Sequence, residues 1–370
     1  MTSALPAHGH ALLIALVAVV ALAAVFAATA GLLHAAGARA ERRRAACWAR
    51  WEPILLGLLV GDGDPAAFAG LAARDERADA LALLAAYALR LDGDSLGVLA
   101  RAAAPLLPAG RAGLRARRAD RRAYAVRLVG LLGTEADRAA LARALRDPSP
   151  HVAMTAARAL ARTHDARYAD DLVGALGRFS GWGTTSVASM LALYGLAGAP
   201  ALVRALADAA APESTRVACA DALRRLGYFP AATAAAALLA DGPDGAPASV
   251  EVSAAALRLL RDVGGPTEAE AVRARLGSTS DVVRMHAVSA LAAVSQHPGD
   301  AARIEHALGD GSPWVAARAA RGLVESGRAA SLRALAAGDG PRSGVARQAL
   351  TEAGLALAEP PALAEPVLHR

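Results

Sequence analysis

The sequence predicts an all-α fold, an α-solenoid of about seven to eight helix pairs that follows one N-terminal transmembrane helix. Three observations support this prediction. Hydrophobic residues make up 55% of the 370 residues but aromatic residues only 4%, and the surplus is Ala and Leu, which have the highest helix propensities. An uncharged apolar run lies near the N-terminus, and an amphipathic helical pattern recurs along the rest of the chain.

The composition excludes several kinds of chemistry. The chain contains no Lys and no Asn, so all 40 basic residues are Arg. This rules out a phosphate-loop lysine, a Schiff-base lysine and a Cys-His-Asn protease. Cys47 and Cys219 lie far apart and do not support a disulfide scaffold. The His residues form no His-x-x-x-His pair. We therefore expect no enzyme activity, no cofactor and no metal site.

Residues 1–10 form a short N-terminal segment, and residues 11–36 are predicted to form the transmembrane helix. No residue from Ala11 to Leu33 is charged, and a bilayer core of about 30 Å needs about 20 helical residues. A cleaved signal peptide is the competing interpretation. It would have basic residues before a shorter apolar core, whereas no basic residue precedes Arg39. The sequence therefore favours an uncleaved anchor.

Basic residues gather on one flank of this segment, at Arg39, Arg42, Arg43 and Arg44. The positive-inside rule then predicts a single pass through the inner (cytoplasmic) membrane, with the N-terminus outside and the C-terminal array in the cytoplasm. We expect this cluster to contact anionic lipid, at about 1 kcal/mol for each Arg. Trp48 and Trp51 suit either a headgroup-level belt or the packing of the next helix.

Residues 37–118 are predicted to be a basic juxtamembrane and atypical helical capping region, which solenoids need at their ends. Three helices are expected here, at Leu55–Val60, Phe68–Leu71 and Ala78–Leu91, with Asp-Gly turns between them. A run of Arg residues from Arg111 to Arg122 suits contact with anionic lipid or a polyanion, or a solvated start to the array.

Residues 119–357 carry the repeat. Val152 to Leu160 and Val315 to Leu323 share one template, an apolar residue, small residues four and five places later, and Leu at the eighth. These positions lie on one helix face. Copies begin about 30 to 37 residues apart, which is the length of two short helices and their turns. The turns at 147–150 and 310–313 contain Asp, Ser and Pro, which suit the cap and first turn of the following helix.

This pattern of Asp-x-Ser-Pro-x-Val, small residues and a closing Leu, at 147–160 and 310–323, resembles the HEAT repeat family. It is most similar to the short bacterial variety that is also called phycobilisome-lyase-like. The layout resembles bacterial single-pass, membrane-anchored HEAT repeat proteins. The resemblance implies a protein-binding scaffold, or alternatively a bilin lyase-like enzyme. Residues 358–370 are expected to form a disordered tail.

One column of the repeat, two places before the closing Leu, is rich in Arg. Because it points away from the apolar face, it is the predicted partner-binding surface, suited to an acidic peptide, a phosphate-rich ligand or a carboxylate. The competing interpretation is a solvated face whose Arg stems cover Ala-rich helices. The column consists of Arg127, Arg158, Leu191, Asp221, Arg258, Ser289, Arg321 and Thr351.

Trp182, in a Gly-rich interruption of the repeat, is a further candidate partner-binding residue, or a side chain folded over the adjacent helices. The predicted function is a membrane-tethered scaffold or adaptor, whose concave array face binds another, membrane-associated protein. A polyanion- or nucleic-acid-binding HEAT protein is a further alternative. No nucleic acid is expected, because aromatic side chains that stack on bases are sparse near the Arg runs.

Overall fold

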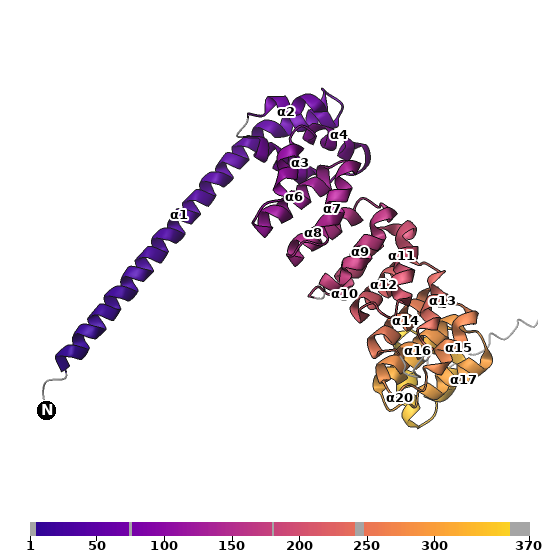
Figure 1. Cartoon of the computed structure of the whole chain (residues 1–370). Helices are drawn as coiled ribbons and strands as arrows, with labels where there is room; N and C mark the ends of the chain where they lie inside the picture. Colours follow the sequence, from indigo (N-terminus) through magenta and orange to yellow (C-terminus); the bar gives the residue numbers. More distant parts are fainter. Residues whose placement is uncertain (1–4, 74–75, 180, 241–247, 356–370) are drawn as a thin grey trace, which may run out of the picture. The chain divides into compact units, whose positions relative to one another are not determined.

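A computed structural model describes residues 5–73, 76–179, 181–240 and 248–355 (Figure 1). These residues contain α-helices and short 3-10 helices and no strand, so the predicted all-α fold is confirmed. The chain divides into two compact units, Met1–Arg138 and Ala139–Arg370. The predicted boundary between the capping region and the array, at 118/119, stays a prediction.

The first unit begins with one very long helix, α1 (Leu5–Leu59). Its N-terminal part has a mean hydropathy of 2.6 over its most apolar window, and none of that window is buried. Among the described residues this is the one helix long and apolar enough to cross a membrane. The helix continues past residue 36, so the separate helix expected at Leu55–Val60 is wrong: that segment is the C-terminal end of α1. The apolar pattern there marks a buried helix face rather than a new element.

The C-terminal end of α1 packs into the core of the first unit. Trp51 is 2% exposed, and its ring lies edge-on to that of Phe68 with centroids 5.4 Å apart. Trp48 is partly buried against the same core. Such edge-to-face aromatic pairs stabilise cores by roughly 0.5–1.5 kcal/mol beyond the area they bury. Of the two roles considered for these Trp residues, the structure shows core packing.

The rest of the first unit is a set of short helices. The helices expected at Phe68–Leu71 and Ala78–Leu91 are present as α2 and α3. Two further helices, α4 and α5, were not expected, because Gly93 and Pro105 indicate turns and each instead lies at or near a helix start. The bounds are η1 (Pro65–Ala67), α2 (Phe68–Leu71), α3 (Arg77–Ala88), α4 (Gly93–Ala103), α5 (Leu107–Gly113), α6 (Ala119–Leu132) and η2 (Glu135–Asp137).

The second unit consists of seven helix pairs, each a first helix followed by a second. With α5 and α6 in the first unit this agrees with the predicted seven to eight. The first helices are α7 (Arg138–Ala144), α9 (Ala169–Ala175), α11 (Gly195–Ala207), α13 (Ala231–Ala237), α15 (Ala269–Ala274), α17 (Pro298–Ala307) and α19 (Ala329–Ala336). The second helices are α8 (Pro150–Ala161), α10 (Thr184–Ala192), α12 (Glu213–Leu226), α14 (Val250–Val263), α16 (Asp281–Val294), α18 (Pro313–Glu325) and α20 (Pro341–Glu352).

The two kinds of helix form two layers. Each second helix packs on the next, from α8 through α20, and α9, α11, α13 and α15 pack in succession in the other layer. Short 3-10 turns, η3 (Ala166–Tyr168), η4 (Leu176–Phe179) and η5 (Pro266–Glu268), lead into or follow first helices. Figure 1 shows this alternation along the second unit. A two-layer stack of this kind leaves one face of every second helix uncovered.

The repeat template explains the packing of the second helices. Ala319, Ala320 and Leu323 of α18 are fully buried, as are the matching residues of α8, α12 and α16. A Cβ added at Gly322 would lie 2.9 Å from the Cβ of Ala292 on α16. Small residues are therefore needed because adjacent second helices approach closely.

The turns before α8 and α18 differ in detail from the predicted caps. Ser149 and Ser312 are the N-cap residues, but their side chains make no capping hydrogen bond. Asp147 Oδ1 instead accepts from the Ser149 N–H at 2.8 Å, and Asp310 Oδ1 accepts from the Ser312 N–H at 2.8 Å. The Asp residues thus fix the turn itself. Pro suits the first helical position, because it lacks the backbone N–H that would otherwise have no partner there.

Candidate interaction surface

The uncovered face of the second helices carries charged side chains that pair between successive repeats. Arg258 of α14 lies 3.4 Å from the Asp221 carboxylate of α12. Both residues belong to the predicted column, so one Arg of the column is partly neutralised by its neighbour. Arg224 lies 3.2 Å from Asp262 and 3.7 Å from Asp221, which continues the network between α12 and α14.

A second group of pairs lies farther along the same layer. Arg321 of α18 is 3.6 Å from Glu352 of α20, and both are more than half exposed. Arg261 of α14 is 3.2 Å from Glu325 of α18, although α16 lies between these helices. In a flat layer the axes of α14 and α18 would be about 16–20 Å apart, at 8–10 Å for each step. The two extended side chains therefore meet over the exposed face of α16.

Arg318 of α18 lies near these pairs, because the charges of Arg261, Arg321 and Glu325 all act on it. No carboxylate among the described residues forms an ion pair with it. Its burial, together with the nearby guanidinium groups of Arg261 and Arg321, lowers the pKa of Arg318. The charge of Glu325 acts in the opposite direction, but Glu325 itself pairs with Arg261. A further carboxylate that approached the Arg318 guanidinium would therefore gain a charge-assisted hydrogen bond.

His286 of α16 lies in the same positive environment. Burial is the main cause that lowers the pKa of His286 to about 4, and the charges of Arg258, Arg318 and Arg261 lower it further. At neutral pH this imidazole is therefore uncharged. The positive potential of the surface comes from Arg residues, which stay charged at every physiological pH.

Arg158 and Trp182, which the sequence singles out separately, lie together in the structure. The guanidinium carbon of Arg158 on α8 is 5.2 Å from the centroid of the Trp182 ring, within cation–π distance. Trp182 is partly buried and Arg158 is exposed. This contact agrees with a Trp182 side chain that lies beside the adjacent helix, while its role in binding a partner stays a prediction.

The column does not face solvent along its whole length. Leu191 is fully buried and Ser289 is 5% exposed, so α10 and α16 present no exposed side chain at this position of the column. Arg127 is exposed on α6, which belongs to the first unit. The candidate surface of the second unit therefore comprises two patches, Arg158 with Trp182, and the cluster around Arg318. Whether these residues bind a partner stays a prediction.

Three residues of this surface were not predicted. Arg261 and Arg318 lie one helical turn from Arg258 and Arg321, so reading the column at i ± 3 would have found them. Trp314 is 73% exposed and borders a groove of about 420 Å³ between α18 and α20, which Arg321 and Gln348 also line. The sequence feature that could have predicted Trp314 is a large aromatic residue directly after Pro313, which starts the helix.

The juxtamembrane Arg residues predicted to meet lipid, Arg39, Arg42, Arg43 and Arg44, are exposed on α1. Arg43 and Arg44 each have a side-chain nitrogen 3.9 Å from the Asp79 carboxylate of α3. Within the described ranges, no group of three or more His, Cys, Asp or Glu residues is arranged to hold a metal ion.

Comparisons with known proteins give structural likeness only. No protein-family model matches the sequence. No curated protein matches it either. The complex of CpcE and CpcF of phycocyanin lyase from Nostoc sp. PCC7120 is 20% identical over 67% of this chain and 88% of that chain, with a TM-score of 0.32. A Kap121p mutant is 13% identical over 76% of this chain and 37% of that chain, with a TM-score of 0.46.

An engineered protein is 17% identical over 84% of this chain and 95% of that chain, with a TM-score of 0.37. Identities and TM-scores of this size have no bearing on function. The chain's own helix pairs, their two-layer packing and the buried template residues define the class of fold: it is an α-solenoid of HEAT-like helix pairs, as the sequence predicted.

Proposed function

We propose that this chain is a membrane-tethered scaffold whose second-helix face in the second unit binds an acidic segment of another, membrane-associated protein. The observation that carries the proposal is Arg318, which is partly buried near Arg261 and Arg321 and forms no ion pair with a carboxylate of the described residues. An acidic side chain from a partner would supply the missing counter-charge, as a hydrogen-bonded ion pair with the planar guanidinium.

The geometry around Arg318 favours a protein ligand. The ion pair of Arg261 with Glu325 brings charged groups of α14 and α18 together on this face. Trp314 borders a groove beside the cluster. Interfaces that bind protein segments combine Arg with large aromatic side chains that serve as anchors. A second pair of this composition, Arg158 and Trp182, lies nearer the start of the array.

The tether of this scaffold is α1. Its apolar N-terminal part is long enough to span a bilayer and is not covered by protein. The Arg residues at 39 and 42–44 favour an orientation with the array in the cytoplasm and suit contact with anionic headgroups. Anchoring raises the effective concentration of the array near a membrane-bound partner without any new contact.

The test compares proteins captured by tagged full-length chain from detergent-solubilised membranes. The test variant carries Arg158→Ser, Arg258→Ser, Arg318→Ser and Arg321→Ser. A matched control loses four Arg residues from first helices or their ends, through Arg143→Ser, Arg178→Ser, Arg204→Ser and Arg333→Ser. We expect a partner that the unaltered chain and the control retain and the test variant loses. Equal capture by both variants would refute the role of this face.

A further inference from the structure

A groove in the first unit has the composition of a ligand site. It has a volume of about 750 Å³ and lies among α3, α5 and α6. Its floor is formed by apolar side chains, and polar side chains occur only at its rim. Small-molecule sites commonly have volumes of about 300–1,000 Å³, an apolar lining and a few polar groups that orient the ligand. The floor residues include Leu81, Leu106, Ala109, Gly110, Ala125 and Leu128.

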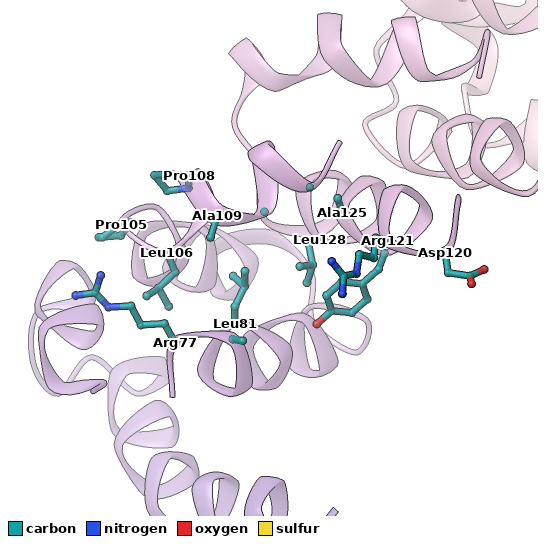
Figure 2. Close-up of a pocket in the computed structure, with 14 residues that line it drawn as sticks. Arg77, Leu81, Pro105, Leu106, Pro108, Ala109, Asp120, Arg121, Ala125 and Leu128 are labelled. Atoms are coloured by element: carbon teal, nitrogen blue, oxygen red, sulfur yellow. The ribbon is translucent and has the colours of Figure 1, made fainter. Parts of the chain in front are cut away.

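Cationic groups lie at both ends of this floor. Figure 2 shows the side chains of Leu106, Leu81 and Leu128 between those of Arg77 and Arg121, with Asp120 directed away from the leucines. Arg77 and Arg121 are both exposed, and neither forms an ion pair with a carboxylate of the described residues. Asp120 lies in the first turn of α6, where the helix dipole stabilises its charge.

Further positive charge surrounds the same rim. Tyr124, which lines the groove, is half exposed. Burial of part of its ring raises the pKa of Tyr124, while Arg44 and Arg127 act in the opposite direction. The phenol is therefore neutral at physiological pH and remains a hydrogen-bond donor. The Arg44 interaction also shows that the rim lies close to the juxtamembrane part of α1, just beyond the apolar segment.

We propose that this groove binds a single-chain anionic amphiphile of the fatty-acid type, with its carboxylate at the Arg77 or Arg121 rim and its hydrocarbon chain along Leu81, Leu106 and Leu128. Leu81, Leu106 and Leu128 are each only 4% exposed, so the open apolar surface of the groove comes from Ala78, Pro105, Pro108 and Ala109 beside them. An alkyl chain covers this surface without leaving polar groups unpaired. A carboxylate meets the unpaired guanidinium groups as a charge-assisted pair. The volume suits one chain and a small head rather than a two-chain lipid.

The test uses the full chain in the membranes of a bacterial expression host. The probe is a long-chain fatty acid with a mid-chain diazirine and a terminal alkyne, and the charge control is the corresponding fatty alcohol. After irradiation, labelled peptides are mapped by mass spectrometry. We expect fatty-acid adducts on α3, α5 and α6, in addition to those on α1 that report contact with the bilayer, and few alcohol adducts in the groove.

Two kinds of variant locate the site. Ala109→Trp fills the groove from α5, whereas Ala112→Trp places the same side chain at an exposed position of α5 outside the groove lining. Groove adducts should disappear in the first variant and persist in the second, with adducts on α1 unchanged in both. Arg77→Gln combined with Arg121→Gln should lower fatty-acid labelling of the groove on the order of tenfold, because the carboxylate loses its charge-assisted contact at whichever end it occupies. It should leave alcohol labelling unchanged.

Several results would overturn the proposal. These are adducts confined to α1, groove adducts that survive Ala109→Trp, or equal labelling by acid and alcohol. Groove labelling by a diazirine phosphatidylglycerol with none from the fatty acid would overturn the single-chain assignment. Because the double Arg variant changes only exposed side chains, it keeps the test decisive if Ala109→Trp fails to fold. These residues are separate from the face around Arg318, so each proposal fails independently.

Discussion

Arg284 and Asp310 join two successive repeats through a pair of parallel hydrogen bonds. The Nε and Nη2 atoms of Arg284 on α16 each donate to a carboxylate oxygen of Asp310, both at 2.8 Å, and Asp310 lies in the turn before α18. The same Arg also donates to the Ser278 carbonyl at 2.9 Å. Comparable two-bond pairs join Arg111 to Asp137 and Arg273 to Asp300. These two-bond Arg–Asp pairs, which we call forks, fix the spacing of neighbouring repeats in addition to their apolar packing.

Replacing Asp310 with Ala should destabilise the array by about 2–3 kcal/mol, since it removes a charge-assisted fork and leaves the Ser312 N–H without its acceptor. Thermal unfolding of the full chain in detergent, followed by circular dichroism, measures this. Glu270→Gln is the control, because Glu270 is 86% exposed and should contribute little. Equal effects of the two changes would show that the fork has no special role.

The forks also predict how stability depends on pH. Pairing with Arg111, Arg273 and Arg284 lowers the pKa of Asp137, Asp300 and Asp310 below the ordinary value of 3.8. A carboxylate whose folded-state pKa is lowered contributes stability at pH values above its unfolded pKa. That contribution is lost as the pH falls through the folded pKa. The unfolding temperature should therefore fall steeply in acid, below about pH 4.

The Asp310→Asn variant gives the control for this pH dependence. It should start from a lower unfolding temperature at neutral pH and lose less on acidification, because one of the three titrating carboxylates is absent. Parallel acid profiles for the variant and the unaltered chain would contradict the assignment of the acid transition to these forks.

Because the second helices pack closely, two Gly→Ala substitutions should change the free energy of unfolding in opposite directions. Gly322→Ala places a methyl group 2.9 Å from the Cβ of Ala292 and should cost about 1–3 kcal/mol through overpacking. Gly344→Ala in α20 meets nothing within 4 Å and should stabilise the chain by about 0.5–1 kcal/mol through helix propensity. Urea unfolding of both variants checks the pair. Stabilisation by Gly322→Ala would contradict the close approach of α16 and α18.

The membrane orientation is testable with a single introduced thiol. Cys47 and Cys219 are both buried, and burial raises the pKa of Cys219 to about 12, so neither should react. Ala330→Cys adds an exposed thiol on α19. In intact cells or spheroplasts a membrane-impermeant maleimide should label this variant only after permeabilisation. Labelling of intact spheroplasts would place the array on the outer side.

The array was predicted well from the sequence, because a solenoid repeats the same helix-packing pattern in each pair. The apolar, small and Leu positions of 152–160 and 315–323 are the buried ones, and their spacing alone indicates the helix face. The first unit was predicted less well. Leu55 belongs to the end of α1, and α4 starts at Gly93, where the chain has a positive φ of 56°. In a region without repeats, the sequence alone does not distinguish a Gly at the start of a helix from a Gly at its end.

The candidate surface was predicted only in part for a related reason. A column defined by register in sequence assumes that the same position is exposed on every second helix, yet Leu191 and Ser289 are buried. The pairing of Arg258 with Asp221 and the isolation of Arg318 depend on distances between repeats. Such distances follow from packing and are not encoded in one helix. The contact of Arg158 with Trp182 likewise joins a helix to a loop of the next repeat.

The most direct test of the proposed scaffold is site-specific photo-crosslinking in native membranes. A benzoylphenylalanine is placed at Trp314, beside the Arg318 cluster, or at Ala330, on the exposed side of the first-helix layer. Our account predicts a protein adduct from position 314 that disappears when Arg318→Ser is added, and no matching adduct from position 330. The same adduct from both positions, or one that persists without Arg318, would contradict it.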